Sequence, residues 1–168
     1  MSAGRLLRLI ARSGRTTEPF PEKADHDLAI REGFTPPRTL RGSAQVRHVD
    51  AGSCNGCEIE LGAALGPVYD AERFGVRLVA SPRHADVAAV TGVVTQNMAE
   101  ALANTVQAVP QPCVVVSIGD CTRGCGLFAG SYAVAGSVDD FVEVDVHVPG
   151  CPPAPEAIVA AFREVTGR

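Results

Sequence analysis

The clearest pattern in this 168-residue chain is a series of short apolar runs separated by stretches with helical spacing. The runs at residues 87–91 and 113–118 are almost wholly apolar and small or β-branched, which is typical of strands buried on both faces of a parallel sheet. Shorter runs at 46–49 and 76–79, and an alternating stretch at 141–148, predict three further strands.

Apolar residues recur at helical spacing between these strands. The pattern predicts a helix directly after Cys57, a short helical segment at 68–74, a helix capped by Thr95, and a C-terminal helix opened by Pro155. Strands that alternate with helices predict an α/β domain with a mostly parallel sheet and helices on both faces. In such sheets, binding sites form in the loops at the carboxyl ends of the strands.

The first 45 residues differ from the rest. Arginines at positions 5, 8, 12 and 15 recur at helical spacing, with leucine and isoleucine on the other side of the helix. This pattern predicts a short basic amphipathic helix that lies on an anionic membrane surface or docks on a partner; the alternative is a frayed tail. Residues 16–45 are rich in proline and charge and indicate an extended arm or disorder. We therefore divide the chain into an arm, residues 1–45, and one domain, residues 46–168.

The overall composition narrows the classes of function. The formal net charge is -4 and the chain has no tryptophan, so nothing favours a nucleic-acid partner. No apolar run approaches the roughly 18 residues of a membrane span, and the N-terminus lacks the pattern of a signal peptide. We therefore expect a reducing compartment, in which the six cysteines are metal ligands or buried thiols rather than disulfides.

Four of the cysteines follow predicted strands. Cys54 and Cys57 come after the run at 46–49, Cys121 follows the strand at 113–118, and Cys151 follows the last strand. Since the carboxyl ends of parallel strands share one edge of a sheet, we expect the three loops to meet there. Four thiolates supplied by a fold, with glycines beside them that bring backbone N–H groups close, are typical of a [4Fe–4S] cluster.

Other uses of these thiols have to be considered. A zinc site with two close pairs would take Cys121 and Cys125 as its second pair. A thioredoxin-like C-x-x-C would use only the first pair and leave Cys121 and Cys151 without a role. Cys113 is predicted to be an inert buried thiol. Cys125 is either a spare thiol or a replacement for Cys121; we favour Cys121 as the ligand because Cys125 lies in a glycine-rich turn.

Several stretches of the chain together resemble a known family. The resemblance covers roughly residues 45–165 and rests on the segments 50–60, 69–75, 81–86, 119–121 and 148–156. They are similar to the small, iron–sulfur subunit of energy-converting, membrane-bound nickel–iron hydrogenases of the formate hydrogenlyase type. They are also similar to the homologous complex I subunit that carries the terminal cluster next to the quinone site.

The resemblance implies a flavodoxin-like fold in which one [4Fe–4S] cluster is bound by Cys54, Cys57, Cys121 and Cys151. The C-x-x-C spacing followed by Glu58 favours the hydrogenase branch, because the complex I branch typically has two adjacent cysteines. Many relatives have glycine at the position of Cys125, which is the one departure from the pattern.

The implied role is that of an electron-transfer subunit of an oxidoreductase complex, with no complete active site of its own. The remaining cysteines, Cys113 and Cys125, are too few to bind a second four-iron cluster. The expected partners are a hydrogenase-like large subunit, a ferredoxin-type iron–sulfur subunit and membrane subunits, on the cytoplasmic side of the cell membrane and peripheral to it. The alternatives are a complex I-type subunit that passes electrons to quinone, and a zinc-stabilised interaction module.

Two further groups of polar residues need an interpretation. Glu58 either accepts hydrogen bonds from loop N–H groups, lies on a proton route to the large subunit, or is a helix-terminal acid favoured by the helix dipole. Arg83, His84 and Asp86 form a partner-facing or quinone-facing loop, or else a local Arg–Asp turn pair.

Overall fold

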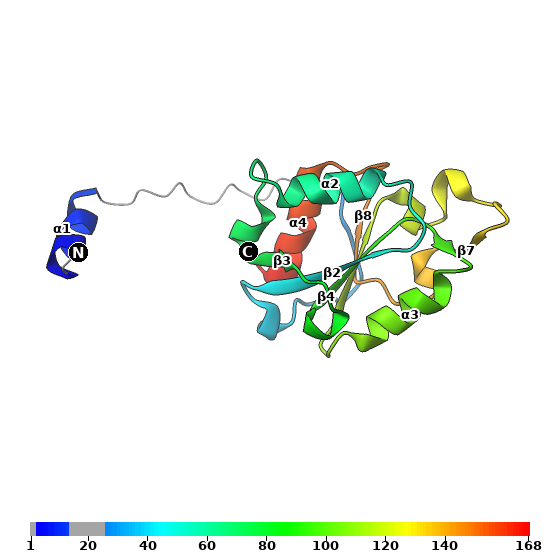
Figure 1. Ribbon diagram of the computed structural model, residues 1–168, viewed down its shortest axis with the longest axis horizontal. Helices are drawn as coiled ribbons and strands as arrows, with labels where there is room; N and C mark the ends of the chain where they lie inside the picture. Colours follow the sequence, from blue (N-terminus) through cyan, green and yellow to red (C-terminus); the bar gives the residue numbers. More distant parts are fainter. Residues whose placement is uncertain (1–2, 14–25) are drawn as a thin grey trace.

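The computed structural model describes residues 3–13 and 26–168, and it has a six-stranded sheet at its centre (Figure 1). The strand order is β1-β8-β6-β4-β2-β3, and all neighbours are parallel except β1 and β8. The strands are β1 (Ala29–Ile30), β2 (Ala44–Asp50), β3 (Val76–Leu78), β4 (Val87–Thr91), β6 (Val114–Ile118) and β8 (Val146–Val148). The five parallel strands follow the order of flavodoxin-like folds, in which the chain reverses direction across the sheet between β2 and β4.

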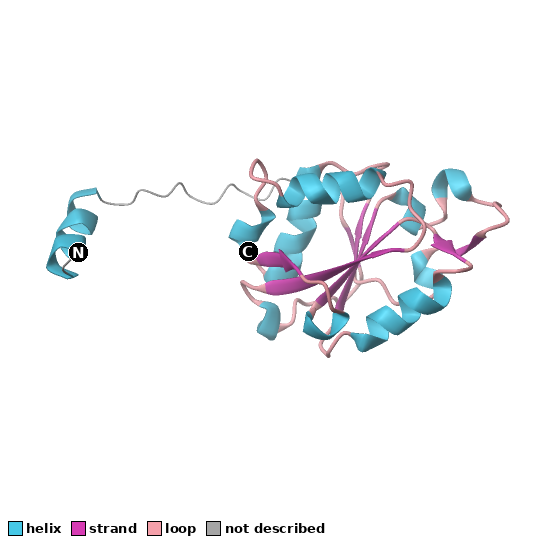
Figure 2. Cartoon of the chain, viewed as in Figure 1, coloured by secondary structure: helices cyan, strands magenta, loops and turns pink. Residues whose placement is uncertain are grey.

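Helices cover both faces of this sheet (Figure 2). On one face α2 (Gly56–Leu65) and α4 (Pro155–Thr166) pack together, and Leu61 and Phe162 join the larger apolar core there. On the other face α3 (Ala99–Ala108) buries Leu102 against a second apolar cluster. The strands β4 and β6 are buried along their whole length, as their continuous apolar runs predict. The predicted α/β class with a mostly parallel sheet is confirmed.

Several predicted elements have different bounds. The helix α2 begins at Gly56, inside the C-x-x-C stretch, and segment 68–74 contains only a 3-10 turn at Ala71–Phe74. The stretch 141–148 contributes only β8, because the chain begins to pair with the sheet only at Asp145. Asp145 N donates to Val115 O at 2.9 Å, whereas the apolar residues before it pack against the α3 side of the core.

The predicted cap of α3 is wrong. The helix begins at Ala99 after Met98, whereas the Thr95 hydroxyl donates to Ala51 O at 3.1 Å. Thr95 instead ends β5 (Val94–Thr95), which pairs with β7 (Val134–Gly136) in a two-stranded antiparallel sheet. This small sheet has no signal in the local pattern, because each of its strands is only two or three residues long.

The described part of the N-terminal arm has two pieces. The helix α1 (Ala3–Ser13) has exposed arginines at positions 5, 8 and 12, as the periodicity predicts. Residues 26–45 run along the domain: β1 pairs with the edge of β8, and Phe34 packs against the larger core. What we predict for residues 14–25, including Arg15, lies outside the described residues, and the boundary at residue 45 stays a prediction. Within the described residues, no helix is both long and apolar enough to cross a bilayer.

Candidate functional site

The four predicted ligand thiols lie at the carboxyl edge of the parallel sheet. Cys54 and Cys57 follow β2, Cys121 lies in a 3-10 turn (Asp120–Thr122) after β6, and Cys151 follows β8. Cys57 and Cys121 are buried, whereas Cys54 and Cys151 are exposed. Three loops that are far apart in the sequence therefore bring two protected and two accessible thiols to the same edge.

The thiols are close enough to affect one another's ionisation. Burial raises the pKa of Cys57 to about 12, with smaller contributions from Glu58 and from the other three thiols. Burial also raises the pKa of Cys121, and the nearby Cys151 and Cys54 raise it further, with a side-chain hydrogen bond to Cys151 among the causes. Each thiolate repels the next, so deprotonating several of these thiols together is unfavourable. A positively charged group bound among them would offset this repulsion and stabilise the thiolates.

Two glycines make this close approach possible. The strand β4 lies between β2 and β6, so the loop that carries Cys54 has to pass the end of β4. A Cβ at Gly92 would lie 2.5 Å from Ser53 N, and φ there is +78°. A Cβ at Gly119, where φ is +95°, would lie 2.5 Å from Cys57 Sγ. Any side chain at these two positions would push the first cysteine loop away from the sheet.

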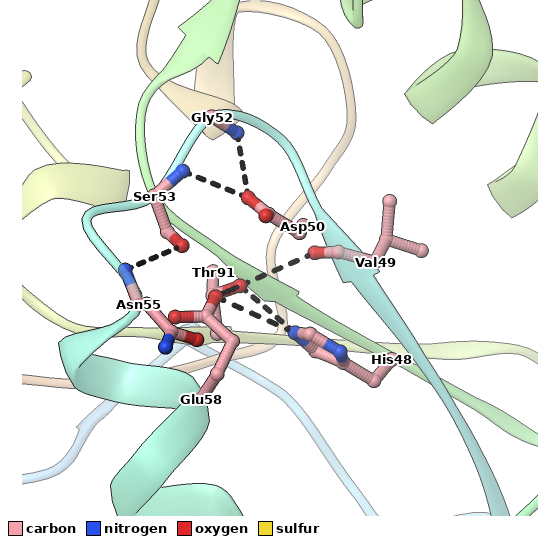
Figure 3. Close-up of polar contacts among 8 residues, drawn as sticks. All are labelled: His48, Val49, Asp50, Gly52, Ser53, Asn55, Glu58 and Thr91. Carbon is pink, nitrogen blue, oxygen red and sulfur yellow. Dashed lines mark hydrogen bonds and ion pairs between the residues drawn. The ribbon is translucent and has the colours of Figure 1, made fainter.

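The first cysteine loop is stabilised by Asp50 at the end of β2 (Figure 3). Its Oδ1 accepts hydrogen bonds from Gly52 N at 2.9 Å and Ser53 N at 2.7 Å, and Ser53 Oγ accepts one from Asn55 N at 3.1 Å. Burial acts to raise the pKa of Asp50, but the hydrogen bonds from Ser53 and Gly52 together outweigh it and lower that pKa. The loop therefore has a defined shape before α2 begins.

The loops of Cys121 and Cys151 are joined to each other. Asp120 N donates to Gly150 O at 2.8 Å, and Asp120 Oδ1 accepts from Gly150 N at 2.7 Å. Behind them, the buried His147 on β8 lies with its Nδ1 2.9 Å from Ser117 Oγ and 3.4 Å from Thr122 Oγ1. Burial lowers the pKa of His147, so the imidazole is neutral at neutral pH. These contacts fix the spacing between the second and third cysteine loops.

Glu58 points into the protein rather than along the helix surface (Figure 3). Its side chain is 16% exposed, and its Oε1 accepts a hydrogen bond from Thr91 Oγ1 at the end of β4. His48 Nε2 lies 2.8 Å from the same Thr91 hydroxyl and 3.7 Å from Glu58 Oε1. The partners of Glu58 are therefore a threonine and a histidine, not the loop N–H groups that we considered from the sequence.

The remaining predicted residues lie apart from this constellation or at its margin. Cys113 precedes β6, at the opposite edge of the sheet, and burial raises its pKa to about 11. Cys125 is half-buried, has a φ of +64°, and is not among the groups that raise the pKa of Cys57 or Cys121. Cys113 is thus half-buried rather than buried as predicted, and the choice of Cys121 over Cys125 stays a prediction.

The loop that contains Arg83, His84 and Asp86 also lies at the opposite edge, because it precedes β4. Asp86 Oδ2 accepts a hydrogen bond from Gln45 N at 2.8 Å, and in the described part of the chain it forms no ion pair with Arg83. The local Arg–Asp pair is therefore wrong for the described residues, whereas the partner-facing or quinone-facing role of this loop stays a prediction.

The chemistry of the donor set fits an iron–sulfur cluster, although the ligand roles stay a prediction. The cysteines at this edge provide four thiols, the ligand type of four-iron clusters. Across residues 3–13 and 26–168, no group of three or more His, Cys, Asp or Glu side chains has the arrangement of a metal-ion site.

Sequence reasoning missed the polar residues that support the cysteine loops from within the sheet. Thr91, Ser117 and His147 are all buried and lie in β4, β6 and β8. Their signal was a polar residue inside an otherwise apolar strand. A polar side chain in such a strand needs a partner: Thr91 finds Glu58 on α2, His147 finds Thr122 in a cysteine loop, and Ser117 finds His147 on the next strand.

The comparison with protein families decides which family the chain belongs to. Residues 54–165 match the model of the NADH ubiquinone oxidoreductase 20 kDa subunit, and this range begins at the first cysteine and contains all four predicted ligands. The chain belongs to this family. It is therefore a subunit of the oxidoreductase-complex type, as the resemblance predicts.

Two curated relatives are named as subunits of a formate hydrogenlyase and of a membrane-bound hydrogenase. Formate hydrogenlyase subunit 7 of Escherichia coli is 42% identical over 149 residues, which cover 89% of this chain and 58% of that protein. A probable membrane-bound hydrogenase subunit of Pyrococcus furiosus is 52% identical over 117 residues, which cover 70% of each protein. The chain thus spans little more than half the length of the first of these relatives.

Solved structures agree with the fold. A chain of the membrane-bound sulfane sulfur reductase, an archaeal respiratory membrane complex, matches with a TM-score of 0.67 and 29% identity, covering 77% of this chain and 71% of that one. A chain of a nickel–iron–selenium hydrogenase from Dm. baculatum matches with a TM-score of 0.54 and 20% identity, covering 70% of this chain and 60% of that one. The second match supports the flavodoxin-like fold alone.

Proposed function

We propose that this chain binds one [4Fe–4S] cluster through Cys54, Cys57, Cys121 and Cys151. The observation that supports the proposal best is that three loops at the carboxyl edge of the sheet carry the four thiols, two of them buried. A cluster of four irons is larger than a single ion, so its ligands stand around it from several loops instead of converging on one point. The glycine at position 119 and the Asp120–Gly150 contacts support this arrangement.

When bound, such a cluster supplies one-electron redox chemistry. The protein's part is to hold the thiols, to limit water at the two buried ones and to orient backbone N–H groups toward the sulfurs. With only Cys113 and Cys125 left over, the chain lacks the cysteines for a second four-iron cluster. We therefore propose an electron-relay subunit that works between redox centres in other subunits.

The proposed partners are those that the sequence resemblance implies, and relatives in multi-subunit complexes support them. They are a hydrogenase-like large subunit, a ferredoxin-type iron–sulfur subunit and membrane subunits of the same complex, with this chain peripheral on the cytoplasmic side. The C-x-x-C spacing at Cys54 and Cys57 and the two hydrogenase relatives favour hydrogenase chemistry. The complex I-type alternative, electron transfer to quinone, is kept because the matching family takes its description from that enzyme.

The helix α1 is proposed to contribute to the membrane association. Arg5, Arg8 and Arg12 are exposed, and at about 100° per residue they fall within roughly 60° of the helix circumference. No acidic residue occurs in the sequence before Glu18. A basic helix of this kind is attracted to anionic lipid headgroups.

The proposed cluster is tested by anaerobic reconstitution of the full chain with iron and sulfide. A broad visible absorption band and a paramagnetic signal on reduction, with about four irons per chain, are the expected results. A colourless protein that binds one zinc would contradict the proposal and favour the zinc-stabilised module.

A pair of cysteine variants tests the ligand assignment. Cys121→Ser is expected to lose the cluster, because it removes a buried ligand thiol, whereas Cys125→Ser is expected to keep it. Both variants make the same chemical change four positions apart, so the difference in iron content reports the ligand role. The opposite result would assign the ligand to Cys125.

A further inference from the structure

The carboxylate of Glu58 is held beside a proposed ligand by two residues from the sheet. Glu58 directly follows Cys57 in the first turn of α2, and its side chain reaches the ends of β2 and β4 (Figure 3). Thr91 is fully buried, and its hydroxyl donates to Glu58 Oε1. A carboxylate fixed in this way has little freedom to turn away toward solvent.

The direction of the hydrogen bonds follows from the number of protons. Threonine has a single hydroxyl proton. The nearer of its two acceptors is Glu58 Oε1, because Val49 O lies 3.5 Å away, so the proton points to Glu58 (Figure 3). At 2.8 Å, His48 Nε2 therefore has to be the donor to Thr91 Oγ1, which assigns the proton of the imidazole to Nε2. The chain of donors runs from His48 through Thr91 to Glu58 and ends on the carboxylate next to Cys57.

The negative charge of Glu58 is not offset by a permanent cation. Its one ion-pair partner among the described residues is His48. Burial lowers the pKa of His48, despite the opposing effect of Glu58 and Asp50, so this imidazole is neutral at neutral pH. The group of three residues thus has a net charge close to that of the carboxylate alone.

The second carboxylate oxygen makes this arrangement costly for the stability of the fold. Glu58 Oε2 is buried and has no hydrogen-bond partner within the part of the chain that the structure describes. An unsatisfied buried oxygen costs free energy of folding, and an apolar residue here would avoid that cost. The position therefore fits a functional demand for charge better than a structural one.

We propose that Glu58, positioned by Thr91 and His48, lowers the reduction potential of the cluster that Cys57 would bind. Reduction adds a negative charge to the cluster, and a fixed carboxylate next to a ligand opposes that charge in a partly buried site. Glu58 directly follows Cys57 in the chain, and its carboxylate is held by Thr91, so the charge stays close to the proposed ligand. This inference rests on the proposed function.

The test compares two variants of the same helix in the reconstituted full chain. Glu58→Gln removes the charge but keeps an oxygen that accepts from Thr91. Glu60→Gln removes the same charge two residues further along α2 and is the matched control. Midpoint potentials are measured by redox titration of the electron paramagnetic resonance signal, after iron content and absorption have shown that each protein holds its cluster.

The expected result is a higher potential for Glu58→Gln. At a fixed potential its ratio of reduced to oxidised cluster rises about tenfold, which corresponds to about 59 mV for one electron. Glu60→Gln shifts the potential by less than half as much. Equal shifts in the two variants, or no shift in Glu58→Gln, would overturn the inference and leave the cluster proposal intact. A wild-type chain without iron would overturn both.

A second variant covers the case in which Glu58→Gln does not retain a cluster. Thr91→Val keeps the carboxylate and the volume of the side chain but removes the hydroxyl that holds Glu58 in place. The freed carboxylate turns toward solvent, so the potential rises, by less than in Glu58→Gln. An unchanged potential in Thr91→Val would show that the position of the carboxylate does not matter and would overturn the positioning role.

Discussion

The substitution Gly119→Ala tests whether the approach of the first cysteine loop to the end of β6 determines the site. Gly119 has a φ of +95° and a ψ of 153°, a backbone region that is essentially limited to glycine. An alanine there costs about 1–3 kcal/mol in backbone strain alone. Its Cβ would also lie 2.5 Å from Cys57 Sγ, and relieving such an overlap adds about 1–3 kcal/mol.

The matched control is Gly124→Ala. This glycine has a nearly equal φ of +90°, but a Cβ there would meet no atom within 4 Å. We expect Gly119→Ala to lose about 2–6 kcal/mol of unfolding free energy and Gly124→Ala about 1–3 kcal/mol. Because only Gly119→Ala moves the Cys57 sulfur, it alone is expected to lose most of its iron after reconstitution.

Urea denaturation followed by circular dichroism measures the two free energies of unfolding, and iron content after anaerobic reconstitution measures cluster binding. The reasoning is refuted if both variants lose the same stability and bind the same amount of iron. In that case backbone strain alone would account for Gly119, and the contact with Cys57 would be irrelevant.

Three further predictions concern the support of the site and of the arm. Asp145→Ala removes the acceptor of the buried Val115 N–H and a partner of Arg31, so it should lower the unfolding free energy by about 1–3 kcal/mol. Glu143→Ala is the control and should cost under about 1 kcal/mol, because the Glu143 side chain is 75% exposed. Equal losses of stability in urea denaturation would contradict this prediction. Burial lowers the pKa of His147 in the folded protein, so the unfolded chain binds a proton first as the pH falls, and the unfolding free energy should decrease below about pH 6.5. His147→Gln should make the slope of unfolding free energy against pH shallower. An unchanged slope in urea denaturation between about pH 5 and pH 8 would contradict this prediction. Replacing the arginines at positions 5, 8 and 12 with glutamine should weaken binding to anionic vesicles roughly fivefold per residue, measured by co-sedimentation. The same change at the exposed arginines 38, 41 and 83 is the control and should have little effect. Equal losses of binding in the two sets would show that net charge, not α1, drives the association.

The agreement between sequence and structure is greatest where the signal is local. Continuous apolar runs predicted β4 and β6, because a strand buried on both faces needs apolar residues at every position. The stretch 141–148 was predicted too long, because its alternation reflects packing against the second core cluster before the chain enters the sheet. The local pattern predicted Thr95 as a helix cap, but its hydroxyl donates a hydrogen bond to the carbonyl oxygen of Ala51, 44 positions earlier in the chain.

By itself, the sequence determined the class of the fold and the candidate ligands. The apolar periodicity indicates alternating strands and helices, and the cysteines follow strands whose carboxyl ends share an edge. Only the tertiary structure decided how the loops meet. The strand β4 lies between β2 and β6, so the first cysteine loop passes close to Gly92, and Gly119 leaves room for the Cys57 sulfur. It also decided the partners of Glu58, because Thr91 lies 33 positions away in the sequence and depends on strand order. Contacts of this kind are set by which strands are neighbours, and no local pattern of residues encodes that order.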